Sequence, residues 1–135
     1  AARKLVAEWP SEIIYSGFEI GISIPYPAIS IDRDYAYVKH HPLAEAYQLY
    51  KPTPHERPTW DLTSVLWAVR PDHGYFDLSP TGRAALDDKG HTTFQVTPEG
   101  KHRHLIVSEA QAVRVREALA QLASQPPERC IEAAP

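Results

Sequence analysis

The clearest repeat of apolar residues lies between Pro58 and Arg70. Four of them recur at spacings of three and four residues, namely Leu62, Val65, Leu66 and Val69. This spacing is typical of a helix with one buried face, and the proline after Arg70 would end the helix because proline cannot continue one. We therefore predict a core helix that carries Asp61 at its start.

Three other segments have the pattern or the boundaries of helices. Residues 1–8 are typical of the end of a helix that Pro10 stops, so we expect the chain to be the C-terminal part of a longer protein. Pro42 would open a second helix with a buried stripe of Leu43, Ala46, Tyr47 and Tyr50. Ser108 and Gln111 form a capping box before a last helix, whose predicted buried residues are Ala112, Val115, Leu119 and Leu122.

Short apolar runs predict the strands. The runs at 12–15 and 18–24 are rich in Ile and aromatic residues and are too short for helices, so we expect both in a largely buried sheet. Three later runs, separated by turns at 87–90 and 98–100, would form a small antiparallel meander: 74–78, 92–96 and 105–107.

The remaining segments are predicted to connect these elements. Residues 28–41 have no periodic pattern and are predicted as a long loop, where Asp34, Tyr35 and Tyr37 could contact a ligand or simply pack. Residues 51–58 hold three prolines and should form an extended connector. We assign residues 1–125 to one domain and expect residues 126–135 to be a disordered tail.

Composition narrows the classes of partner. The chain has 135 residues, enough for about one domain with a core. Its net charge is −3 and its pI is about 6.2, so we expect no basic surface for nucleic acid or anionic membrane. No apolar run approaches the roughly 20 residues of a membrane span. The single cysteine, Cys130, cannot form a disulfide within the chain.

Asp61 has two interpretations. As an N-cap, its carboxylate would accept a hydrogen bond from a backbone N–H one turn into the helix and would complement the positive end of the helix dipole. As a metal ligand, the same carboxylate would supply one oxygen to a hard cation such as Ca²⁺, which needs several such oxygens. The spacing of the residues leaves both interpretations open.

The histidines also have alternatives. His102 and His104 would share one face of a strand and could bind a metal with His91. The basic residues beside them favour exposed positions at a strand edge or turn instead, because they would repel a cation. His41 precedes Pro42, so it could cap that helix or lie beside a substrate cleft.

Several motifs occur in a fixed order. The run IIYSGFEI at 13–20 follows the helix tail at 1–8, PTWDLTSVL at 58–66 opens the core helix, and a strand-rich segment covers 75–107. In this order they resemble the C-terminal portion of the inosine-uridine preferring nucleoside hydrolase family. Its members have a strand and Ser-Gly turn, a His-Asp-Pro-x-Ala-Val-Ala helix start and a late β-meander at the matching places. The resemblance covers residues 1 to about 124.

The resemblance implies hydrolysis of the N-glycosidic bond of ribonucleosides by a water that Ca²⁺ activates. Asp61 matches the family's C-terminal calcium-binding Asp. Trp60 lies where many members have the His proposed to protonate the leaving base. Because an indole does not titrate in the useful range, Trp60 could at most stack on the base.

The chain departs from the family upstream. It has neither the Asp-x-Asp-x-x-x-Asp-Asp cluster, which supplies the other calcium ligands and the general base, nor the Glu-Phe-Asn sugar-binding segment. Asp87 and Asp88 are no substitute, since they are predicted in a turn. One carboxylate cannot build a site of six to eight oxygens, so we expect the chain alone to be inactive.

Two hypotheses follow for an α/β fold that is the C-terminal half of a nucleoside hydrolase-like fold. In the first, the chain is part of a Ca²⁺-dependent nucleoside hydrolase-like protein, with Asp61 as metal ligand and Trp60 and His41 as substrate-binding residues. In the second, it is a non-catalytic nucleoside- or sugar-binding or interaction module. Both predict a small-molecule partner, no nucleic acid and no membrane, and a homo-oligomer or self-association through an exposed sheet edge.

Overall fold

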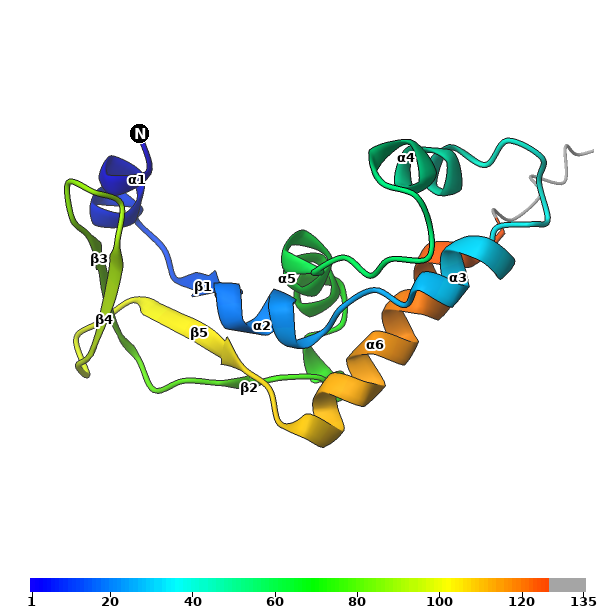
Figure 1. Ribbon diagram of the computed structural model, residues 1–135. Helices are drawn as coiled ribbons and strands as arrows, with labels where there is room; N and C mark the ends of the chain where they lie inside the picture. Colours follow the sequence, from blue (N-terminus) through cyan, green and yellow to red (C-terminus); the bar gives the residue numbers. More distant parts are fainter. Residues whose placement is uncertain (127–135) are drawn as a thin grey trace, which may run out of the picture.

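A five-strand open sheet and six α helices form the described part of the chain, residues 1–126 of a computed structural model (Figure 1). The α/β class predicted from the sequence is confirmed. The helices are α1 (Ala2–Glu8), α2 (Phe18–Ser23), α3 (Ala28–Arg33), α4 (Pro42–Tyr50), α5 (Trp60–Val69) and α6 (Glu109–Ser124), with a 3₁₀ turn η1 (Pro71–His73). The strands are β1 (Ile13–Tyr15), β2 (Asp77–Leu78), β3 (Gly82–Leu86), β4 (Thr92–Val96) and β5 (His102–Ile106).

The elements are spread along an elongated molecule. Figure 1 shows α1 with the β3–β4 hairpin at one end and α3 with α4 at the other, while α2 and α5 lie between them. Helix α6 runs obliquely from the end of β5 toward α3. The predicted tail and Cys130 fall outside the described residues, apart from residue 126.

Strand β5 is the centre of the sheet, whose order is β1-β5-β3-β4 with β2 also on β5. It runs parallel to β1 and antiparallel to β2 and β3, and β3 forms an antiparallel hairpin with β4. The predicted meander is therefore wrong, because β5 does not pair with β4, the strand before it in the chain. It pairs instead with β1, β2 and β3. The sequence pattern missed β3, whose GRAAL segment contains no β-branched or aromatic residue.

Helix α2 (Phe18–Ser23) occupies the run at 18–24, so the predicted strand there is wrong. Ile20 and Ile24, four residues apart, are 3% and 1% exposed, whereas Phe18 and Ile22 are 67% and 50% exposed. This is the periodicity of a short helix with one buried face. An apolar run of seven residues does not distinguish such a helix from a buried strand.

The predicted loop at 28–41 contains helix α3, so that prediction is only partly right. Ile31 and Tyr35 are both 3% exposed and form a second hydrophobic cluster with Tyr26. Of the two roles considered for this segment, contacting a ligand or packing, Tyr35 therefore has the packing role. Tyr37 remains 43% exposed.

Helices α4 and α5 form where the sequence predicts them, but their buried faces differ from the prediction. In α5, Leu66 is 2% exposed, whereas the other predicted core residues Leu62, Val65 and Val69 are 37%, 57% and 65% exposed. In α4, the residues that pack against the second cluster are Ala44 and Tyr47, while Leu43 and Tyr50 are largely exposed.

Helix α6 is confirmed, together with its start. The Ser108 hydroxyl accepts a hydrogen bond from the Gln111 backbone N–H, and the Gln111 side chain accepts one from the Ser108 N–H. Its buried face packs into the main core, to which α2, α5 and β5 also contribute: Ile20, Ile24, Leu66, Phe76, Leu105, Val115, Ala118 and Leu119.

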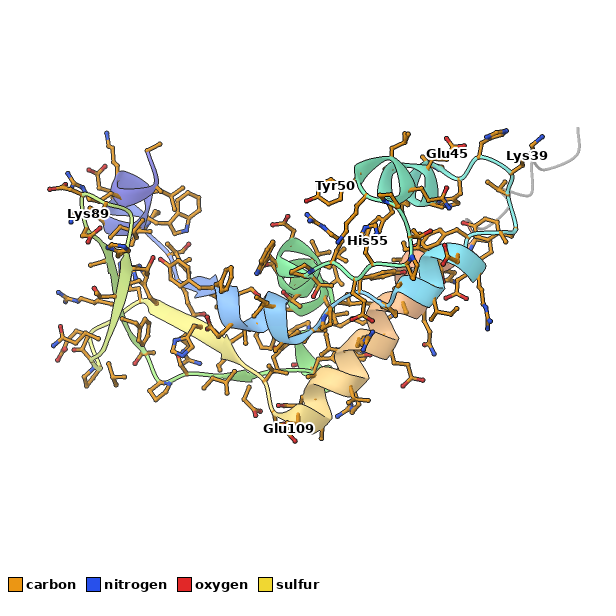
Figure 2. The ribbon with its side chains drawn as sticks, viewed as in Figure 1. Lys39, Glu45, Tyr50, His55, Lys89 and Glu109 are labelled. Carbon is orange, nitrogen blue, oxygen red and sulfur yellow. The ribbon has the colours of Figure 1, made fainter. Side chains whose placement is uncertain are left out.

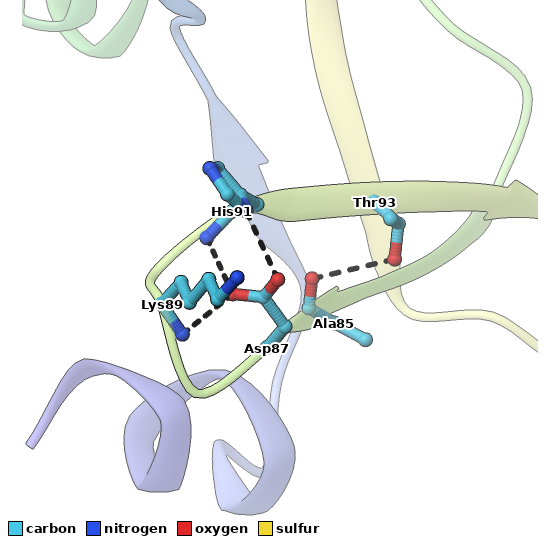
Figure 3. Close-up of polar contacts among 5 residues, drawn as sticks. All are labelled: Ala85, Asp87, Lys89, His91 and Thr93. Carbon is cyan, nitrogen blue, oxygen red and sulfur yellow. Dashed lines mark hydrogen bonds and ion pairs between the residues drawn. The ribbon is translucent and has the colours of Figure 1, made fainter.

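The turn predicted at 87–90 is confirmed as the tip of the β3–β4 hairpin (Figure 3). The Asp87 carboxylate accepts hydrogen bonds from the backbone N–H groups of Lys89 and His91, each at 2.8 Å, and lies 3.0 Å from His91 Nδ1. The backbone bond from His91 is the main reason why the pKa of Asp87 lies below its ordinary value. Asp88 pairs with Arg3 of α1. Both aspartates therefore have structural partners.

His102 is buried in the sheet, so the predicted exposed position is wrong for it. Its exposed fraction is 7%, and its Nδ1 accepts a hydrogen bond from the Ala84 backbone N–H at 2.8 Å. This bond joins β5 to β3 next to the Gly82–His102 pair. The His102 side chain thus contributes a hydrogen bond to the pairing of β3 with β5.

The surface of the chain is large for its mass. It exposes 9648 Å², whereas a compact monomer of 15.2 kDa exposes roughly 7100 Å². Residues 127–135 can account for at most roughly 1400 Å² of the total. An excess of more than about 1000 Å² therefore comes from the described residues, and most of their exposed large apolar side chains lie on helices. None of the helices in residues 1–126 is long and apolar enough to cross a membrane.

Removing the His102 acceptor should weaken the sheet. We expect His102→Ala to lower the free energy of unfolding by roughly 1–3 kcal/mol, since it leaves the buried Ala84 N–H without a partner. His102→Asn places an oxygen near the position of Nδ1 and should recover part of the loss. Urea unfolding of the two variants tests this, and equal stabilities for both would contradict it.

The exposed apolar surface should make the isolated chain self-associate. At micromolar concentration we expect it to elute from a sizing column well above 15.2 kDa, because exposed apolar patches of this kind drive association. A Val65→Lys, Val69→Lys double variant should shift the profile toward the monomer. A sharp monomeric peak for the unchanged chain would count against the prediction.

Candidate functional site

The start of α5 is fixed to α2 by three hydrogen bonds. Thr59, which is 2% exposed, donates its backbone N–H to the Gly21 carbonyl at 3.0 Å and its hydroxyl to the Ile24 carbonyl at 2.6 Å. The Trp60 indole N–H donates to the Phe18 carbonyl at 3.1 Å. These bonds set the position of the first turn of α5, which carries two of the predicted site residues.

Trp60 packs closely on α2. Its ring stacks on Phe18 with centroids 5.5 Å apart and planes inclined by 28°, and 37% of the side chain remains exposed. A Cβ at Gly21 would lie 2.1 Å from Trp60 Cδ1 and 2.7 Å from the Trp60 backbone nitrogen. Glycine is therefore required at position 21 for the two helices to approach this closely.

A pair of hydroxyl groups adds a fourth link. Thr63 is 0% exposed, and its Oγ1 donates to a main-chain carbonyl of the preceding turn, either Trp60 at 2.9 Å or Thr59 at 3.1 Å. Because that hydrogen is used, Ser16 must be the donor in the 2.8 Å contact between its Oγ and Thr63 Oγ1. Ser16, which directly follows β1, is thus hydrogen-bonded to α5.

Asp61 lies in the first turn of α5 and is exposed. The N-cap residue of the helix is Thr59, so the interpretation of Asp61 as the cap is wrong. Within residues 1–126 its carboxylate has no hydrogen bond or ion pair, although its place in the first turn suits the helix dipole. Its oxygens can therefore accept a ligand from outside the described residues.

His41 is the N-cap residue of α4, as one of its two interpretations predicts. Its Nδ1 accepts a hydrogen bond from the Leu43 backbone N–H at 3.3 Å, so its Nε2 carries the proton in the neutral ring and donates to the Tyr37 hydroxyl at 3.0 Å. Its ring also lies 4.6 Å from that of Tyr35. In the side-chain view of Figure 2, the segment around Lys39 lies at the edge of the molecule, far from α5. The structure does not bring His41 together with Trp60 and Asp61.

The hydroxyl group of Tyr35 belongs to a chain of buried, hydrogen-bonded hydroxyl groups. Its hydroxyl lies 2.8 Å from the Tyr26 hydroxyl, which lies 3.1 Å from Ser30 Oγ. Burial, with help from the bond to Tyr26, raises the pKa of Tyr35 above its ordinary value, so the hydroxyl stays protonated. This network of hydrogen bonds stabilises the second cluster.

A cleft of about 490 Å³ lies next to the Phe18–Trp60 stack. Phe18 and Glu19 of α2 line it together with residues of four other segments: Tyr15, Ser16, Gly17, Ala84, Thr92, Phe94 and His104. Its volume is within the range of small-molecule sites. No sequence pattern predicts this cleft, because β1, β3, β4 and β5 contribute to it without a shared motif.

The three histidines considered as a metal site do not come together. His91 contacts Asp87, His102 Nδ1 is bonded to the Ala84 N–H, and the ring of His104 meets the edge of Phe94 at 4.8 Å. Over residues 1–126, no group of three or more His, Cys, Asp or Glu side chains is arranged to hold a metal ion.

Comparisons with known proteins give no further indication of the site. No model of a known protein family, no curated protein and no solved structure matches this chain.

The contact between Gly21 and Trp60 gives a test of this geometry. We expect Gly21→Ala to lower the free energy of unfolding by roughly 1–3 kcal/mol, since the new methyl group overlaps both the ring and the backbone of Trp60. The NMR signal of the Trp60 indole N–H should shift as its bond to Phe18 is lost. Glu19→Ala, an exposed change on the same helix, is the control and should alter neither.

Proposed function

We propose that the chain is part of a longer nucleoside hydrolase-like protein, called the parent below. The parent would hydrolyse the N-glycosidic bond of ribonucleosides. The observation that carries the proposal is the start of α5, where an exposed Asp61 follows the half-exposed Trp60 on a turn fixed by four hydrogen bonds. A carboxylate held in one place is what a metal or polar substrate site requires.

The described residues do not by themselves fit a calcium ion. Ca²⁺ takes six to eight oxygen ligands, and within residues 1–126 Asp61 belongs to no group of three or more potential ligand side chains, which falls far short of that number. The proposal therefore treats Asp61 as a single ligand and requires the others to come from elsewhere in the parent. Calcium, when bound, would activate the attacking water.

Trp60 has a binding role in this proposal and no proton-transfer role. Its indole N–H is already bonded to the Phe18 carbonyl, and an indole does not supply a proton near neutral pH. The half-exposed ring and the neighbouring cleft of about 490 Å³ suit the flat base of a nucleoside. His41 is left out of the site, since its ring is occupied by Leu43, Tyr35 and Tyr37.

A non-catalytic nucleoside- or sugar-binding module is the second candidate. It is favoured by the same two features that weaken catalysis, namely Trp60 in place of a titrating histidine and the lack of an acidic cluster in residues 1–126. Such a module would use the aromatic surface and the cleft to hold a ligand without breaking a bond. The two candidates differ in whether the parent releases ribose.

The first test is the coding sequence upstream of Ala1. If it encodes an Asp-x-Asp-x-x-x-Asp-Asp segment after a strand, we expect the parent to bind Ca²⁺ and Asp61→Ala to weaken that binding by at least about tenfold without changing its fold. Asp72→Ala, an exposed change in η1, is the matched control and should leave binding unchanged. Unchanged Ca²⁺ affinity in Asp61→Ala would contradict the role given to Asp61.

Ribose release separates the two candidates. The hydrolase predicts that the parent releases free ribose from inosine or uridine and that a chelator stops the reaction. The binding module predicts that the same nucleosides raise the melting temperature of the parent while no ribose appears. Measurable turnover would exclude the binding module, and its absence together with a melting shift would exclude the hydrolase.

A further inference from the structure

A second cavity, of about 280 Å³, lies between helix α1 and the sheet, at the end of the molecule away from α3 and α4 (Figure 1). Helix α1 packs on β3 there. The lining comes from α1, from β3 and from the segment that leads into β5. The cavity shares only Ala84 with the cleft beside Phe18. Its volume lies at the lower end of the range for small-molecule sites, so a small ligand would fill it.

His102 supplies this cavity with a hydrogen-bond donor that is held in place. The residue is 7% exposed, and its Nδ1 accepts the Ala84 backbone N–H at 2.8 Å. A ring nitrogen that accepts a hydrogen bond carries no proton, so in the neutral ring the proton is on Nε2. Within residues 1–126, the bond from Ala84 is the only hydrogen bond of the ring. Nε2 is not among the fully shielded unpartnered atoms of these residues, so a ligand in the cavity can reach its N–H.

The charged side chains of the lining leave one positive charge in excess. They are two cations, Arg83 and Lys101, and one carboxylate, Glu99. The pKa of Glu99 is lowered mainly by the hydrogen bond from Thr97 and in smaller part by Arg83, so Arg83 and Glu99 partly balance each other. Lys101 Nζ donates to the Pro10 carbonyl at 3.1 Å, which leaves two of its three N–H groups for another acceptor. A ligand with a single negative charge would balance the cavity.

The residues from α1 and its C-cap add an apolar wall, made of Val6, Ala7 and Trp9. Trp9 is 50% exposed, and its indole N–H donates to Ser11 Oγ at 2.9 Å. This bond uses the polar edge of the ring and leaves its apolar face for contact with a ligand. A molecule that has both a charged group and a flat apolar group therefore matches the lining.

We propose that this cavity binds a small aromatic monocarboxylate. The carboxylate accepts the Nε2–H of His102 and pairs with Lys101, while the aromatic ring of the ligand packs on Trp9. A phosphate dianion matches less well, because the carboxylate of Glu99 repels its second charge. The site is independent of the proposed function, since it includes no residue of α5 and none of its hydrogen-bond partners on α2.

Titration of the unchanged chain with sodium benzoate tests the proposal. We expect saturable NMR shifts of the His102 ring nitrogens and of the Trp9 indole N–H, while the Trp60 indole signal stays in place. Sodium acetate should bind more weakly because it has no ring to pack on Trp9. Inorganic phosphate at about pH 8, where it is mostly a dianion, should also bind more weakly. Absence of a saturable shift with benzoate would overturn the inference, and tighter binding of phosphate would overturn the choice of a carboxylate.

Two substitutions assign the binding to the named groups. Lys101→Ala removes a cation, and His102→Asn keeps an acceptor for the Ala84 N–H while it removes the donor at Nε2. Each should weaken benzoate binding at least about tenfold, because each removes a hydrogen bond to a charged group. Lys89→Ala, which removes an exposed cation at the hairpin tip outside the cavity, is the matched control and should leave the affinity unchanged.

The Lys101 variant keeps the test decisive if His102→Asn fails to fold. Lys101 is exposed, so we expect Lys101→Ala to retain the circular dichroism spectrum of the unchanged chain. Unchanged benzoate affinity in this folded variant would overturn the inference. An equal loss of affinity in Lys89→Ala would also overturn it, since benzoate would then respond only to the overall charge of the chain.

Discussion

The arrangement around the candidate site depends on the hydrogen bond that the Thr59 hydroxyl donates. It donates to the Ile24 carbonyl at the end of α2 while the backbone N–H of the same residue donates to Gly21. One residue therefore satisfies two main-chain carbonyls, one within α2 and one at its C-cap, and a helix of six residues would not be stable alone in water. The connector after α4 must end at this point, so α5 can begin only where α2 holds it.

The main core depends in turn on this attachment. Leu66, one turn after Thr63, packs with Ile20 and Ile24 of α2, and Val115 of α6 closes the cluster from the other side. The sheet reaches the cluster through Leu105 of β5. Because β5 joins only short strands, the core is narrow and much of the helix surface stays outside it. A narrow core with a large exposed surface is expected to give marginal stability.

The sequence predicted the elements whose signals are local. The capping box at Ser108 and the prolines at 42 and 71 set helix boundaries within a few residues, and the structure has these boundaries. The signal failed where structure depends on distant residues. β3 has no β-branched or aromatic residue, and its pairing includes close approaches between distant residues: a Cβ at Gly82 would overlap Gln95 and Phe94, and a Cβ at Gly100 would overlap Gly82. His102 is buried because Ala84, 18 residues away, donates to it.

In the candidate site, too, only the residues with a local sequence signal could be predicted. The sequence located Asp61 and Trp60 at a helix start because that start has a periodic pattern behind it, but it could not find Thr59 and Ser16, whose partners are 35 and 47 residues away. It also assigned the wrong face of α5 to the core. Periodicity finds an apolar stripe without saying what covers it, and Thr63, a polar residue, takes the fully buried place because its hydroxyl is bonded twice.

The exposed apolar stripe of α5 makes this error informative. Leu62, Val65 and Val69 have the spacing of a buried stripe, and yet they are exposed on a helix whose opposite side is already packed. A helix that is apolar on both sides is ordinarily buried on both sides. In residues 1–126 the residues with the clearest helical spacing are therefore not the ones that form the core, because tertiary contacts and not periodicity decide which side of α5 is buried.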